Sequence, residues 1–101
     1  MNIDTQKEGS TARLLLNGRF DFNSHVVFNQ STDSLLKDAG VDELELDFDQ
    51  VKYIDSSAMG MLLLLKERAK GASKSITLLN CKGSVAQVFE LSNFRRLFTI
   101  K

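Results

Sequence analysis

Three consecutive segments decide the fold: Glu43-Leu44-Glu45-Leu46-Asp47-Phe48, then Asp55-Ser56-Ser57, then the apolar run Ala58-Met59-Gly60-Met61-Leu62-Leu63-Leu64-Leu65. The first alternates strictly between acidic and apolar residues, which predicts a β-strand covered on one face only. The last is apolar on all sides and continues through charged residues to Lys70, and this length favours a buried helix over a buried strand. We therefore expect a strand and a helix in succession, with the helices of the fold gathered mainly on one side of the sheet.

Patterns of the same two kinds flank this unit. Alternation predicts four further strands, over residues 3–8, 12–17, 75–79 and 97–100. Helical spacing predicts a helix from about Ser24 to Ala39, capped by Asn23 or Ser24, and Ser84-Val85-Ala86-Gln87 fits a capping box that would start a third helix. The order β-β-α-β-α-β-α-β indicates an α/β fold with a mixed, mostly parallel β-sheet packed by helices.

Composition limits the classes of protein that the chain can represent. Its 101 residues suit one domain spanning 1–101, and 43% hydrophobic with 26% charged residues is ordinary globular usage. A net charge of zero predicts no nucleic-acid partner and no anionic membrane surface. One cysteine and one histidine exclude a disulfide and a Cys/His metal site, so no metal is expected. No secretory leader is visible, which predicts a cytoplasmic protein.

Motifs for catalysis are also missing from the sequence. A serine hydrolase needs a base beside its nucleophile, but Gly-X-Ser-X-Gly is absent and His25 is the only histidine. The phosphate-binding P-loop and the dinucleotide fingerprint Gly-X-Gly-X-X-Gly are absent as well. We therefore expect a protein that is not an enzyme and that carries no cofactor.

The segment Asp55-Ser56-Ser57 has two interpretations. Asp and Ser are favoured at helix starts, and capping alone accounts for most such segments. A hydroxyl at a helix N-terminus is also a suitable phosphate acceptor, because unpaired N–H groups and the helix dipole favour negative charge there.

A family resemblance bears on this choice. Residues 53–64, from Tyr53-Ile54-Asp55-Ser56-Ser57 to Leu64, look like the Asp-Ser-Ser-Gly-Leu-Gly signature of STAS-domain anti-sigma factor antagonists. Upstream, Leu16-Asn17-Gly18-Arg19-Phe20-Asp21 is similar to that family's Gly-X-hydrophobic-Asp segment. Downstream, residues 79–81 and 88–94 resemble its fourth strand, third helix and following turn. Together these segments cover nearly the whole chain in the right order.

The resemblance implies a function and a site. The second signature serine is the phosphoacceptor in the family, so Ser57 is the expected acceptor and Ser56 the less favoured one. The implied partner-binding residues are Asp21, Asp55, Ser56, Ser57, Ala58 and Met59. The implied partners are an anti-sigma factor or serine kinase, bound only without the phosphate, and a PP2C-type phosphatase, either separate or part of a response regulator. Such systems govern transcription in motility, biofilm formation or stress responses.

The sequence departs from the family pattern at Ala58, where glycine is usual. Alanine is the better helix former, so the helix start is expected to survive, but the extra methyl group could alter how a partner approaches. This leaves a second interpretation open. The chain would then be a constitutive STAS subunit of a lipid-transport or stress-sensing assembly, without a phosphoserine cycle.

Overall fold

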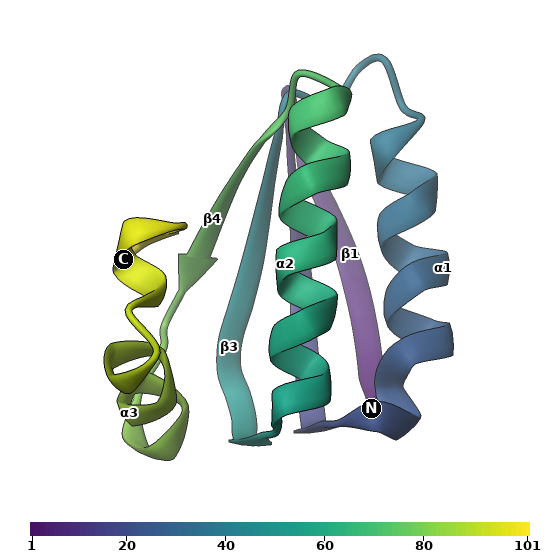
Figure 1. Ribbon diagram of the computed structural model, residues 1–101. Coiled ribbons are helices and arrows are strands. Elements are labelled where there is room, and N and C mark those ends of the chain that lie inside the picture. The colour runs from purple at the N-terminus through teal and green to yellow at the C-terminus, as the bar shows by residue number, and fades with distance from the viewer.

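The computed structural model describes residues 1–101 as one layer of helices on a five-stranded sheet (Figure 1). The strands are β1 (Asn2–Glu8), β2 (Thr11–Phe20), β3 (Glu43–Ile54), β4 (Ser75–Leu79) and β5 (Thr99–Ile100). The helices are α1 (His25–Leu36), α2 (Ser56–Gly71) and α3 (Gly83–Leu91), with 3-10 turns η1 (Phe22–Ser24) and η2 (Phe94–Arg96). This confirms the expected order of elements. None of the helices is long and apolar enough to cross a membrane.

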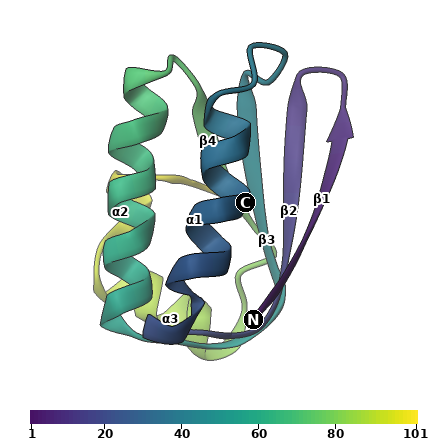
Figure 2. The same ribbon diagram turned by 90° about the vertical axis from the view of Figure 1, so that its right-hand side faces the viewer.

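The strands lie in the sheet in their sequence order. β1 and β2 form an antiparallel hairpin, and each later strand pairs in parallel with the one before it. Right-handed crossovers that always step in the same direction place every crossover helix on the same face of a sheet. Figure 2 shows this one-sided arrangement, as the strict alternation of β3 predicted.

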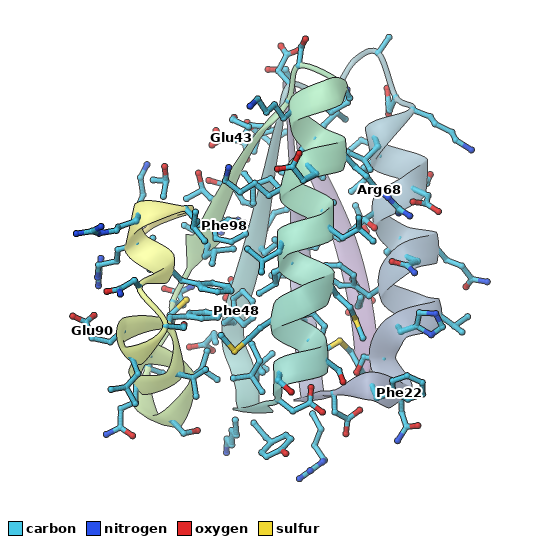
Figure 3. All side chains as sticks on the ribbon, viewed as in Figure 1. Phe22, Glu43, Phe48, Arg68, Glu90 and Phe98 are labelled. Atoms are coloured by element: carbon cyan, nitrogen blue, oxygen red, sulfur yellow. The ribbon has the colours of Figure 1, made fainter.

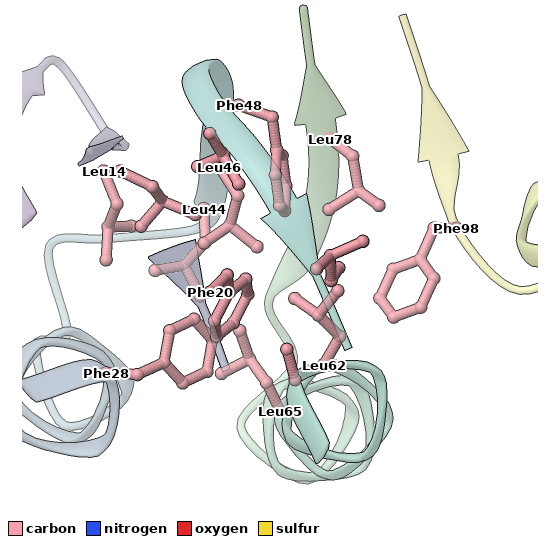
Figure 4. Packing of buried hydrophobic residues seen from close by; sticks show 14 of the residues in the cluster. Leu14, Phe20, Phe28, Leu44, Leu46, Phe48, Leu62, Leu65, Leu78 and Phe98 are labelled. Carbon is pink, nitrogen blue, oxygen red and sulfur yellow. The ribbon is translucent and has the colours of Figure 1, made fainter. Parts of the chain in front are cut away.

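The core lies between the helices and the sheet (Figure 4). From β3 it takes Leu44, Leu46 and Phe48, all fully buried. Six of the seven phenylalanines form one continuous series of ring contacts from α1 to the residue just before β5. In order along this series they are Phe28, Phe20, Phe48, Phe89, Phe94 and Phe98. The seventh, Phe22, is 68% exposed.

The acidic residues of β3 face the side of the sheet without helices, but they are not all solvated as expected. Asp47 is only 8% exposed. Its Oδ1 accepts hydrogen bonds from the Asp49 N–H at 2.9 Å and the Asn80 side chain at 3.1 Å. The period-two pattern of β3 alone would predict that Asp47 is solvent-exposed, but contacts between neighbouring strands bury its carboxylate. The two hydrogen bonds to Asp47 compensate the free-energy cost of that burial.

Two boundaries near the first helix differ from expectation. β2 continues past Gly18 to Phe20: Gly18, with a φ of 109°, pairs with Val51, and the register with β3 shifts by one residue before Arg19. α1 begins at His25, after the turn η1, and it ends at Leu36 rather than Ala39. Neither Asn23 nor Ser24 caps it with a side chain.

The third helix also starts differently from expectation. It begins at Gly83 and has no side-chain cap, so the predicted capping box from Ser84 to Gln87 does not form. The Ser84 hydroxyl instead donates to the Lys52 carbonyl oxygen at 2.9 Å. The last strand is shorter than expected, because the N–H groups of Leu97 and Phe98 donate to the Phe94 carbonyl of η2 at 3.0 and 2.8 Å instead of pairing in the sheet.

Candidate functional site

The candidate site lies where two parallel strands end side by side. Phe20 of β2 pairs with Ile54 of β3, and the Asp55 N–H donates to the Phe20 carbonyl at 3.3 Å. The next residue of each strand is an aspartate, Asp21 and Asp55 respectively. Parallel pairing therefore brings together the two acidic residues of the sequence prediction, although 34 positions separate them along the chain.

Asp55 begins the helix that carries the signature serines. Its backbone is extended, with φ −114° and ψ 179°, and its Oδ1 accepts a hydrogen bond from the Ala58 N–H at 2.9 Å. This is the geometry of an N-cap, in which a side chain satisfies an N–H that the helix leaves unpaired. The capping interpretation of Asp55 is thus correct, and it does not use either serine.

Ser56 and Ser57 form the first two positions of α2. Ser56 is exposed and Ser57 is half-buried. No acidic residue occupies the first turn of this helix. The four N–H groups at the start of a helix lack helical partners, and the dipole there favours negative charge. A phosphate on either hydroxyl would therefore meet favourable electrostatics from α2 itself.

The two residues after the serines point mostly inward. Ala58 is fully buried, and Met59 is partly buried against the core. The methyl group of Ala58, where the family usually has glycine, therefore faces the core and adds nothing to the outer surface. Because the whole residue is buried, a partner that binds here would not contact Ala58 directly.

Asp21 organises the turn η1 beside the serines. Its side chain accepts from the Asn23 N–H at 3.0 Å, while its own N–H donates to the Ser24 hydroxyl at 3.2 Å. These reciprocal bonds form a capping box. The carboxylate also lies 3.5 Å from Nε of Arg19. Asp21 thus holds the loop that faces the start of α2.

The turn η1 and the start of α1 also present apolar residues that the sequence interpretation missed. Phe22 is 68% exposed and Val26 is 58% exposed, and Phe22 stacks on His25 with ring centroids 5.9 Å apart. Figure 3 shows Phe22 at the same end of the molecule as the start of α2. Phe22 and Val26 are four residues apart in the sequence, and neither lies on the face of α1 that carries the buried Phe28. This spacing is the signal from which an exposed apolar pair could have been predicted. Large exposed apolar side chains of this kind mark interaction surfaces when they gather.

Comparisons with known proteins agree with this fold. The family model described as "Mlab, STAS domain" matches residues 3–99. A STAS-domain containing protein of Pseudomonas aeruginosa (strain UCBPP-PA14) is 36% identical over 93 residues, which is 92% of this chain and 90% of that protein. This chain therefore belongs to the STAS-domain family.

Solved structures place the fold among anti-sigma factor antagonists. One from Mycobacterium paratuberculosis matches with a TM-score of 0.86 at 12% identity, covering 98% of this chain and 83% of that one. SpoIIAA in its unphosphorylated form matches with a TM-score of 0.75 at 16% identity, covering 99% and 87%. The phosphorylated form of the Bacillus protein gives the same TM-score. The chain thus has an anti-sigma factor antagonist-like STAS fold.

Proposed function

We propose that this protein is a cytoplasmic anti-sigma factor antagonist, a binding protein without catalytic activity that works by partner switching. In its unphosphorylated form the surface around Ser57 binds an anti-sigma factor or serine kinase. Phosphorylation of Ser57 releases that partner, and a PP2C-type phosphatase, either separate or part of a response regulator, restores binding. The output is control of transcription in motility, biofilm formation or stress responses.

One observation carries this proposal: Asp55 alone caps α2 and leaves both serine hydroxyls free of that role. A phosphoserine adds about −1.5 to −2 charges. Placed at Ser57, that charge would lie in the first turn of α2, two residues after Asp55 and at the end of the molecule that carries the exposed Phe22. It would repel a partner by charge and by the cost of desolvation, while leaving the fold intact.

The structural relatives support the same mechanism. SpoIIAA is described as an anti-sigma factor antagonist, and it has been solved with and without its phosphate. Both forms match this chain equally well, with TM-scores of 0.75. A switch that changes surface charge without refolding the domain accounts for that similarity.

Phosphopeptide mapping of the protein isolated from its own cells tests the proposal. Trypsin releases residues 53–66 as one peptide that holds both serines. We expect phosphate on Ser57, lost in a Ser57→Ala strain and kept in a Ser56→Ala strain. Absence of phosphate from this peptide in growing, starved and stressed cells alike would overturn the switch.

A second candidate is a STAS subunit bound constitutively in a lipid-transport or stress-sensing assembly. The matching family model is described as "Mlab, STAS domain" and names no antagonist, so family membership alone does not favour the switch over this candidate. The two candidates differ in their response to a charge at Ser57. Binding to the natural partner that resists Ser57→Asp would favour the constitutive subunit, and loss of that binding would favour the switch.

A further inference from the structure

An irregularity in the pairing of β3 with β2 changes the direction in which side chains near the end of β3 point. Gly18 pairs with Val51 and Arg19 pairs with Tyr53, so Lys52 is an extra residue in β3. In a regular strand Lys52 and Tyr53 would face opposite sides of the sheet. Here both are exposed, whereas Val51 is buried. Bulges re-aim side chains in this way and are frequent beside functional sites.

A side chain at the start of α3 anchors the bulge. The extra residue leaves its carbonyl group without a regular ladder position, and the hydroxyl of Ser84 donates to that oxygen at 2.9 Å. The bond ties the bulge to the first turn of α3. The backbone of β3 at Lys52 is therefore held in place by α3.

A polar cavity of about 500 Å³ lies against this bulge. It is lined by Asn17, Gly18, Arg19, Gln50, Lys52 and Tyr53. Two of these residues are cationic, two are amides and none is acidic. The lining therefore offers several donors to an anion and includes no carboxylate, but the Gln50 side chain already donates to Asp49 Oδ2 at 2.7 Å.

The two cations of the cavity, Arg19 and Lys52, differ in the interactions that they already make within the chain. The guanidinium carbon of Arg19 lies 3.9 Å from the centre of the Tyr53 ring, and its Nε lies 3.5 Å from Asp21 Oδ2. Lys52 takes part in none of the six ion pairs of the chain. Its ammonium group is thus free to pair with a charge brought by another molecule.

We propose that this cavity receives an acidic segment of the partner protein that binds beside Ser57. The existence of such a partner rests on the proposed function. Arg19 and Tyr53 each lie two residues before the aspartates of the site, so the cavity and the serines share one edge of the sheet. Small-molecule pockets are predominantly apolar, whereas Tyr53 is the one hydrophobic residue here. Attraction between the two cations of the cavity and an acidic segment would accelerate association and orient the partner.

The test is an NMR titration of the ¹⁵N-labelled protein with a hexaglutamate peptide at low ionic strength. We expect amide shifts confined to residues 17–19 and 50–53. Lys52→Glu should weaken binding roughly fivefold or more, because it removes an attraction and adds a repulsion. The control is Lys37→Glu, which makes the same change in charge at an exposed lysine outside the cavity and should bind as the parent does.

Each other outcome overturns the proposal. Shifts spread over all the lysines, or equal effects of the two substitutions, would mean nonspecific attraction. Binding of inorganic pyrophosphate in a parallel titration, without binding of the peptide, would assign the cavity to a small anion. The titration uses neither phosphate on Ser57 nor the natural partner, so its failure is distinguishable from failure of the phosphoserine cycle.

Discussion

Asp55 Oδ1 accepts a hydrogen bond from the Ala58 N–H at 2.9 Å, and this contact separates the structural role of the signature from its proposed regulatory role. The aspartate holds the helix start, so the serines next to it are free to be modified. A carboxylate that caps a helix also lies where a phosphate would add its charge. The stability of α2 and the chemistry of Ser57 can therefore be tested independently.

Removing the cap should destabilise the domain without changing the surface serines. We expect Asp55→Ala to lower the free energy of unfolding by about 1 kcal/mol, within the range of about 0.5–2 kcal/mol for lost N-caps. Asp55→Asn keeps an oxygen acceptor and should lose little. Urea unfolding monitored by circular dichroism measures both, and equal losses would show that the charge, and not the hydrogen bond, stabilises the helix.

A negative charge at Ser57 should stabilise the isolated domain. Ser57→Asp places a carboxylate in the first turn of α2 and should raise the free energy of unfolding by about 0.3–1 kcal/mol over Ser57→Asn. The asparagine variant has the same shape without the charge. The difference should shrink in 1 M salt, where screening acts within about 3 Å. A destabilising effect of the aspartate would show that repulsion from Asp55 and Asp21 exceeds the helix dipole.

Two leucines of α2 should respond very differently to truncation. Leu62 is fully buried, whereas Leu64 is 52% exposed. Leu62→Ala should cost about 2–5 kcal/mol through lost burial and a cavity, and Leu64→Ala about 0.5 kcal/mol or less. Urea unfolding of the two variants gives the comparison. Similar losses would mean that the helix is rotated relative to the structure described here.

The thiol of Cys81 should be unreactive in the folded protein. Burial, with a smaller contribution from Asp47, raises its pKa to about 11 from 9.0, although Arg95 acts in the opposite direction. Thiolate is the reactive form, so labelling by a disulfide reagent at pH 8 should be much slower in the native protein than in urea. Fast labelling of the native protein would contradict the burial of this side chain.

The same shift gives stability a pH dependence. The pKa of Cys81 is raised in the folded state, so its contribution is fully present below pH 9 and is lost as pH rises toward 11. Cys81→Ser should remove this contribution. The measurement is the free energy of unfolding from pH 8 to 11 for both proteins, and parallel curves would count against a perturbed thiol.

The sequence by itself determined the order of elements and the position of the serines. The period of two in Leu44, Leu46 and Phe48 indicates a strand that is covered on one face. The length of the apolar run that begins at Ala58 indicates a helix. Both signals are local, because each depends on side chains a few residues apart. The same holds for the placement of Ser56 and Ser57 at the start of a helix.

Tertiary structure alone decided how distant residues meet. The pairing of Phe20 with Ile54 brings Asp21 to Asp55, and the bulge at Lys52 turns two neighbouring side chains to one side. Burial of Asp47 depends likewise on Asn80, 33 residues away. Strand register, bulges and hydrogen bonds between strands arise from contacts across long sequence separations, and no periodicity within one segment records them.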